Sequence, residues 1–329
     1  MGAFRTTGEC LIEWLFELVG RRVGLAVSLD DLNRAVTVHG YKDWLPNPTD
    51  DSIRVRAEEC EALAYSAMDH FGSVDAWRSV RPLEDRVSDR LQDSHVAREA
   101  IRYVESREKN ADLLGISDSR RRSLVSGTIG TGDSTLTHAV SVVLDEINIR
   151  HSMKPWVKYQ GPEWRDLLSL SELFSSESTM SSYGKFFDQR FINYLVTNHD
   201  ELSLINWRKF EGLVGEYFHR CGFEVALGPG RNDDGVDLRI WESHTGTDEP
   251  PLLIVQCKRE KRKISKVTVK ALAADVIWEG AQQGLLVATT DWSPGARNLV
   301  QTRKYRVSEV NRAAVHSWLA DMHSSGVGL

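Results

Sequence analysis

Three polar residues in the C-terminal part of the chain have the types and spacing needed for metal-assisted hydrolysis. Asp237 stands at the start of one strand-like run, and Gln256, 19 residues later, and Lys258 close a second run, LLIVQCK. Because side chains alternate across a strand, Gln256 and Lys258 share one face. If the two runs pair as a hairpin, an acid, an amide oxygen and a lysine converge at one end of a sheet. Such a group can hold Mg²⁺ through oxygen ligands, activate water and neutralise charge developing on a phosphate.

A helical glutamate and a basic stretch flank this group in the sequence. Glu211 lies in WRKFEGLVGEYF, beside an apolar stripe at helical spacing, and is a further candidate metal ligand. The stretch from Gln256 to Lys270 contains seven basic residues and one acidic residue, Glu260, so its local net charge is +6. Besides Lys258, the candidate contacts to a nucleic-acid backbone are Arg259, Lys261, Arg262, Lys263, Lys266 and Lys270.

The strands and helices that must position these residues can be predicted from the spacing of apolar residues in the C-terminal half, where strand-like runs alternate with helical spacing. Short apolar or alternating runs predict strands at Phe223–Leu227, Val236–Glu242, Leu252–Lys258 and Gly284–Thr289. Helical spacing predicts helices at about Leu204–Cys221, Lys266–Trp278 and Ser308–Met322. The order α-β-β-β-α-β-α implies a small mixed sheet flanked by helices.

The N-terminal two-fifths of the chain have helical spacing throughout, and no strand alternation competes with it. The expected helices there are Glu9–Val19, Leu29–Val36, Ser52–Phe71 and Leu83–Arg107. A polar tract, SSESTMSS, and two prolines mark a loop-rich segment after them. We therefore expect a mainly helical region for recognition or assembly at 1–150, a linker at 151–185 and a second domain at 186–329.

Composition and charge narrow the function classes. The chain has 329 residues, 41% hydrophobic and 27% charged, which is ordinary globular usage. Its net charge of −6 divides unevenly: Ile205 to Leu329 holds 17 basic and 15 acidic residues, which leaves 24 basic and 32 acidic before it. No apolar run approaches the roughly 18 residues of a membrane span, and no signal peptide is recognisable, so we expect a cytoplasmic protein. The four cysteines form no CxxC pair, which argues against a disulfide framework or a structural zinc site.

The motifs together resemble the catalytic domain of Mrr-type restriction endonucleases, a branch of the PD-(D/E)XK nuclease superfamily. The resemblance covers about 186–319 and rests on WRKFEGLVGEYFHRCGFEV, GRNDDGVDLRI, LLIVQCKR and GLLVATTDWSPGA. It implies an α/β restriction-endonuclease-like domain in which Asp237, Gln256 and Lys258 form a metal-dependent cleavage site assisted by Glu211. The residues before about 180 do not resemble the winged-helix module often joined to such domains.

We therefore expect an Mg²⁺-dependent DNA endonuclease, acting in restriction or anti-phage defence, with DNA as its partner. Two alternatives remain open: a DNA-binding sensor or scaffold whose nuclease fold does not cut, and an RNase that uses the same site. A homodimer is expected because cutting both strands of a duplex needs two active sites or two visits. Defence-system partner proteins are a further expectation.

Overall fold

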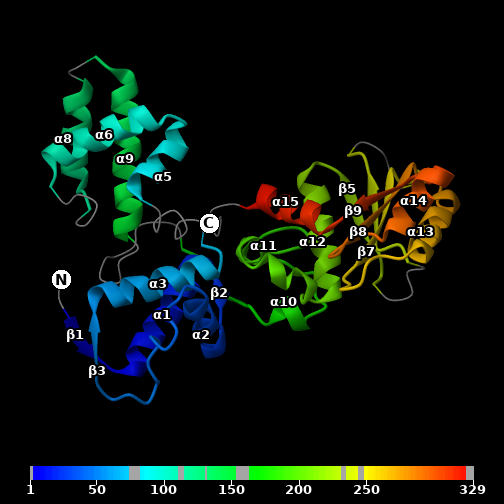
Figure 1. Ribbon diagram of the computed structural model, residues 1–329, viewed down its shortest axis with the longest axis horizontal. Coiled ribbons are helices and arrows are strands. Elements are labelled where there is room, and N and C mark those ends of the chain that lie inside the picture. The colour runs from blue at the N-terminus through cyan, green and yellow to red at the C-terminus, as the bar shows by residue number, and fades with distance from the viewer. Residues whose placement is uncertain are drawn as a thin grey trace. The chain divides into compact units, whose positions relative to one another are not determined.

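The computed structural model describes residues 3–73, 82–109, 115–129, 132–152, 163–230, 235–243 and 248–323. It divides into two compact units, Met1–Arg165 and Asp166–Gly328 (Figure 1). The division falls within the segment 151–185 that the sequence predicts as a linker, of which 153–162 lies outside the described residues.

The first unit begins with helices and a short pair of strands. Its first elements are β1 (Ala3–Thr6), α1 (Gly8–Val23), β2 (Leu25–Ala26), α2 (Leu29–Val38), β3 (Ile53–Arg56) and α3 (Ala57–His70). Strands β1 and β3 pair antiparallel, with Phe4 opposite Val55. The expectation of helices without strands was wrong here: the predicted helix Ser52–Phe71 starts as β3 and becomes helical only at Ala57.

Four further helices share one hydrophobic cluster. They are α5 (Leu83–Leu91), α6 (Ser94–Arg107), α8 (Asp118–Ile129) and α9 (Ser134–Ser152). The single helix predicted at Leu83–Arg107 was wrong, because the helix is interrupted between α5 and α6. Gln92 takes a left-handed conformation (φ 55°), and the Asp93 side chain accepts hydrogen bonds from the next N–H groups, so it caps a new helix.

The second unit is built on a five-stranded sheet. Its elements are β4 (Leu168–Ser169), α10 (Glu172–Ser175), α11 (Gln189–Thr197), η1 (His199–Ser203), α12 (Trp207–Arg220), β5 (Glu224–Leu227), β6 (Leu238–Trp241), β7 (Leu253–Lys258), α13 (Lys266–Trp278), β8 (Gln283–Ala288), α14 (Pro294–Arg303), β9 (Val307–Val310) and α15 (Arg312–Met322). The strand order is β5-β6-β7-β8-β9. The first three strands pair antiparallel and the last three pair parallel, so the sheet is mixed.

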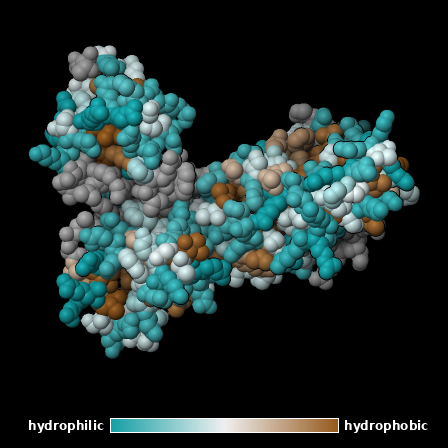
Figure 2. Space-filling view, in the orientation of Figure 1, coloured by the Kyte–Doolittle hydropathy of each residue, from teal (hydrophilic) through white to brown (hydrophobic). Residues whose placement is uncertain are grey.

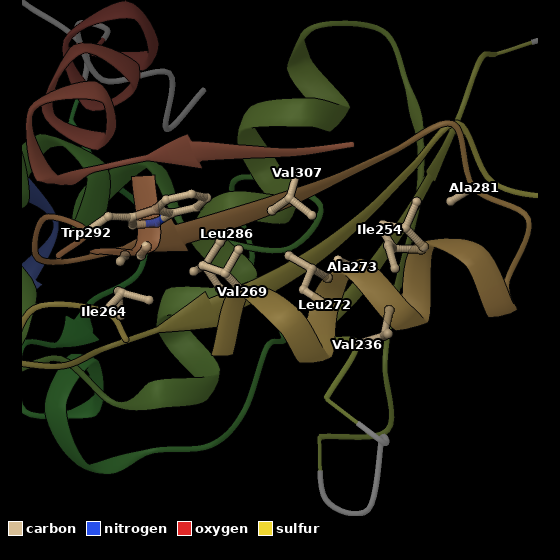
Figure 3. Packing of buried hydrophobic residues seen from close by; sticks show 13 residues of the cluster. Val236, Ile254, Ile264, Val269, Leu272, Ala273, Ala281, Leu286, Trp292 and Val307 are labelled. Atoms are coloured by element: carbon tan, nitrogen blue, oxygen red, sulfur yellow. The ribbon is translucent and has the colours of Figure 1, made fainter. Parts of the chain in front are cut away.

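Helices cover both faces of this sheet. Gly215 of α12 lies against Leu238 of β6, which pairs with Val255 of β7. Gly284 of β8, which pairs with Ile254 of β7, lies against α13 instead. Neighbouring residues of a strand face opposite ways, so α12 and α13 lie on opposite faces. Figure 3 shows the cluster on the α13 face, where Val269 and Leu272 of the helix join Leu286 and Ile254 of the sheet.

The predicted fold class is confirmed: a helical N-terminal region precedes a domain with a central mixed sheet between helices. The surface in Figure 2 is mostly hydrophilic, with scattered hydrophobic side chains. Among the described residues, no helix has the length and apolar character that crossing a bilayer requires.

Candidate active site

Asp237 and Gln256 lie on adjacent strands, at the end of the β6–β7 pair. The two strands pair antiparallel with Leu238 opposite Val255, and Asp237 and Gln256 are the next residues outward on each strand. The Asp237 N–H donates to Val255 O (2.9 Å), and Asp237 Oδ2 accepts from Cys257 N–H (2.6 Å). Asp237 is only 8% exposed and Gln256 only 6%. The predicted hairpin therefore forms, and it fixes the carboxylate against the backbone of β7.

The loop before β6 holds the Gln256 amide. Gln256 Nε2 donates to Gly235 O over 2.8 Å, and Gly235 has φ +89°, a conformation that favours glycine. A Cβ added at Gly235 would lie 2.9 Å from the same Nε2 atom. Gln256 Oε1 is buried and accepts no hydrogen bond from the described part of the chain. Buried polar atoms normally have a partner, so this oxygen is suited to an incoming ligand.

Lys258 ends β7 and is partly exposed. Its carbonyl accepts from Thr289 N–H at the end of the neighbouring strand β8 (3.1 Å). The Thr289 hydroxyl accepts from Glu260 N–H and donates to Glu260 O, both over 3.1 Å. Thr289 is 5% exposed, so a buried side chain braces the turn that carries the chain from Lys258 into the basic stretch.

Glu211 reaches the same region from α12. Asn206 caps this helix, and the apolar residues of the predicted stripe turn toward the core. Glu211 is 4% exposed, and Arg208, one turn earlier, donates to its Oε2 over 2.6 Å. Arg208 also donates to Gly228 O over 2.8 Å. A buried carboxylate needs such a partner, because desolvation of an unpaired charge is costly.

The thiol of Cys257 reports the electrostatics between these groups. Burial raises the pKa of Cys257 well above its usual range, the charges of Asp237 and Glu211 raise it further, and Lys258 lowers it. Both carboxylates and the lysine therefore act on one buried sulfur atom. The four residues that the sequence singles out, from α12, β6 and β7, lie around the same strand end.

The basic stretch follows directly on this end of the sheet. All six candidate backbone-contacting residues are exposed: Arg259, Lys261, Arg262, Lys263, Lys266 and Lys270. Arg259 nevertheless donates to Ile205 O (2.6 Å) and Leu204 O (3.2 Å), so part of its role is to fix the loop. Lys266 and Lys270 lie on α13, with Lys270 one turn further from the strand end.

The donor set at the strand end is two carboxylates and one amide oxygen. In the ranges that the structure describes, no three His, Cys, Asp or Glu side chains gather where they could hold a metal ion. An amide oxygen lies outside that residue set, and Mg²⁺ keeps several waters while binding one or two carboxylates. The oxygens of Asp237, Glu211 and Gln256 therefore fit a hard divalent cation, and the buried acceptor of Gln256 is the observation that supports this fit.

Sequence reasoning missed Arg208 and Thr289, which hold Glu211 and the turn after Lys258 in place. Arg208 could have been found from its spacing, since it precedes Glu211 by three residues on a helix, where opposite charges meet. Thr289 carries no such local signal. It lies 29 residues after Glu260 in sequence and approaches it only through the parallel pairing of β7 and β8.

Comparison with known proteins finds similarity in the part of the chain that carries these residues. Residues 202–319 match the family model Mrr_cat, described as a restriction endonuclease, so this part of the second unit is similar to restriction endonuclease domains of that family. The resemblance seen in the sequence is thus confirmed over this range.

Two individual proteins are similar to parts of the chain. An uncharacterized protein of Sinorhizobium fredii (strain NBRC 101917 / NGR234), y4cE, is 26% identical over 102 residues, which are 31% of this chain and 26% of the relative. The solved structure of MspJI restriction endonuclease in complex with a 27-mer oligonucleotide matches with TM-score 0.29 and 18% identity, over 59% of this chain and 43% of that one. The chain thus spans about a quarter of the curated relative and less than half of the solved structure.

Proposed function

We propose that the chain is an Mg²⁺-dependent endonuclease that hydrolyses phosphodiester bonds in DNA, in restriction or anti-phage defence. The observation that carries the proposal is the strand end of β6 and β7. There the Asp237 carboxylate and the buried Oε1 of Gln256, which accepts no hydrogen bond from the described residues, lie on adjacent strands beside Lys258. The match of 202–319 to a restriction endonuclease family supports the same reading.

Asp237 and Gln256, with Glu211, would hold the metal through oxygen atoms. When bound, Mg²⁺ supplies an activated water and neutralises charge on the phosphate. Cys257 N–H keeps Asp237 Oδ2 in place, and the Arg208 guanidinium pairs with Glu211 and orients it. Both carboxylates are thereby set in position before substrate arrives, which lowers the cost of reorganisation during the reaction.

Lys258 is the cation of the site. Its ammonium group positions the attacking water or stabilises the extra negative charge that the phosphate gains in the transition state. The exposed residues that follow it at the same end, Lys261, Arg262, Lys263 and Lys266, neutralise backbone phosphates of the DNA. Binding through phosphates releases counterions, so affinity should fall steeply with salt.

The helical unit Met1–Arg165 is proposed to recognise the target or to assemble with defence partner proteins. Acidic residues outnumber basic residues in this unit, so its net negative charge disfavours broad contact with the DNA backbone. We also propose that the protein acts as a homodimer, because a duplex has two strands to cut.

The test incubates the full chain with supercoiled plasmid, methylated and unmethylated, and with an RNA of the same sequence in the same tube. Each reaction is run with Mg²⁺ or with EDTA. Asp237→Asn and Lys258→Met should each lower the cleavage rate by about 10²-fold or more, since each removes a charge from the site. Asp321→Asn, an exposed acid on α15, is the matched control and should cut like wild type.

Each outcome separates the readings. Cleavage of plasmid that needs Mg²⁺ and is lost in both site variants supports the DNA endonuclease. Cleavage of RNA alone favours the RNase. Binding of DNA without cleavage of either substrate, with or without methylation, contradicts the proposal and favours the sensor.

A further inference from the structure

Helix α13 presents an apolar face to solvent. Val267 is 70% exposed, Ile277 73% and Trp278 90%, and Ala271 and Ala274 are exposed between them. Large apolar residues with such exposure are scattered elsewhere on the chain, but here they share one helix. A contiguous apolar patch on the surface of a folded protein commonly marks an interaction surface.

The exposed apolar residues have the spacing of a helix–helix contact. Val267, Ala271, Ala274 and Trp278 follow one another at intervals of four, three and four residues. This is the spacing of the a and d positions of a coiled coil. The other side of α13 is buried against the sheet by Val269, Leu272, Ala273 and Val276. A helix that is apolar on both sides is normally covered on both sides.

We propose that a second copy of this chain covers this face, with the two α13 helices packed side by side and parallel. Charge on the two flanks selects this partner and this direction. Lys270 directly precedes Ala271, and Asp275 directly follows Ala274. In a parallel pair, Lys270 of one copy lies beside Asp275 of the partner subunit, five positions later, and the two-fold axis makes this pair twice. An antiparallel pair places the lysine flanks of both copies on one side and the aspartate flanks on the other, so like charges share each side.

The direction of α13 in the fold gives this arrangement a consequence for cleavage. Strand β7 ends at Lys258, and α13 starts at Lys266, near that same end of the sheet. Its second half lies near the start of β8, where Gly284 approaches Leu272 and Val276. The helix thus runs antiparallel to β7 and β8.

A two-fold axis along α13 therefore turns both candidate active sites toward the same side of the dimer. The basic residues that follow Lys258 on each copy would face the same way. Two such ends can engage the two strands of one duplex, whereas an antiparallel dimer would direct them to opposite sides. This use of the dimer rests on the proposed DNA cleavage, while the association itself does not.

The association should be weak. Helix α13 has 13 residues, about 20 Å in length, and two of its four contact positions are alanine. Such a face buries well below the roughly 800 Å² per partner of a standard interface. We therefore expect a monomer–dimer equilibrium that depends on concentration and becomes more favourable when a duplex holds two copies together.

The first test is sedimentation of the full chain in EDTA, from about 1 to about 100 µM, so that cleavage plays no part. Wild type should change from monomer to dimer across this range. Trp278→Ser should raise the dissociation constant at least about tenfold, since it removes the largest contact. Met180→Ser, which replaces another 90%-exposed apolar residue of the same unit, should dimerise like wild type. Wild type that stays monomeric at every concentration, or Trp278→Ser that dimerises equally well, overturns the proposal.

The second test measures direction. In a chain whose exposed Cys10 and Cys221 are replaced by Ser, Trp278→Cys should form a disulfide-linked dimer with itself under mild oxidation. In an antiparallel dimer, cross-links would form only between Trp278→Cys and Val267→Cys chains. That result, or cross-linking of neither variant, contradicts the parallel pairing. Because both tests work without metal or substrate, an inactive protein that dimerises as described would count against the proposed function and not against this interface.

Discussion

Gly235 connects the loop before β6 to the candidate metal ligand Gln256, and Gly235→Ala tests whether this contact sets the site. At φ +89° a residue with a Cβ costs about 1–2 kcal/mol. The new Cβ would also lie 2.9 Å from Gln256 Nε2, so the buried amide must shift and lose its 2.8 Å hydrogen bond to Gly235 O. That loss costs about 1 kcal/mol more. We expect the free energy of unfolding to fall by about 2–3 kcal/mol in total.

Gly222→Ala is the matched control. Gly222 lies in the same unit at φ +90°, but a Cβ there meets nothing within 4 Å. The two substitutions therefore share the backbone strain and differ in the contact with Gln256. Urea unfolding of both variants should show the control about 1 kcal/mol less destabilised than Gly235→Ala.

Plasmid cleavage under single-turnover conditions separates the two variants further. A displaced Gln256 Oε1 misplaces a candidate metal ligand, and an error of about 1 Å in a catalytic geometry costs about 10²-fold in rate. We expect that loss for Gly235→Ala and a rate within about twofold of wild type for Gly222→Ala. Equal cleavage rates for the two variants, with both folded, would refute the role given to Gln256.

Three further predictions follow from other contacts. Burial lowers the pKa of His70 from 6.5 to about 4, so the folded state keeps this ring neutral while the unfolded chain takes up a proton. Stability should thus be unaffected above pH 6.5 and fall by about 2 kcal/mol at pH 5, and His70→Gln should flatten this dependence in urea unfolding. Arg208→Ala leaves Glu211 buried without its guanidinium, and unfolding should show a loss of about 3 kcal/mol that Arg208→Lys partly restores. Lys261→Ala and Arg262→Ala should each reduce the slope of log affinity for DNA against log salt by about 1, whereas Arg303→Ala, on exposed α14, should not.

The core of the site could be predicted because its signals are local. Asp237, Gln256 and Lys258 each end or begin a short run whose alternation indicates a strand, and the two runs follow one another along the chain and pair antiparallel. The strand runs themselves do not point to Arg208 or Thr289: the pairing of Arg208 with Glu211 follows from helical spacing, but its contact with Gly228 and the position of Thr289 depend on the tertiary fold. Arg208 acts through Gly228 as well as Glu211, and Thr289 acts through the pairing of parallel strands.

The contrast between local signals and long-range contacts also explains which parts of the fold could be predicted. The strands β5 to β8 and their helices carry strong periodicity, and the predicted mixed sheet is present. The helix predicted at Ser308–Met322 was wrong at its start, because Val307–Val310 forms β9 and the helix begins only at Arg312. The pair β1–β3 was missed because each strand has four residues and its partner lies about 50 residues away in sequence, so no local pattern specifies it. The break between α5 and α6 did have a local signal, since Asp93 is a strong N-cap residue, but the apolar spacing continues across it.

The amide at position 256 suits this site better than a third carboxylate would. Asp237 and Glu211 already place two charges around one buried strand end, where the Cys257 thiol responds to both. A third acid would add like-charge repulsion, and when ionised it could not donate to Gly235 O. Gln256 instead uses its nitrogen to fix the loop that carries Asp237 and keeps its oxygen as an acceptor. One side chain thus helps to position the candidate ligand Asp237 and is itself a second candidate ligand, which ties the local fold of the loop to the proposed chemistry.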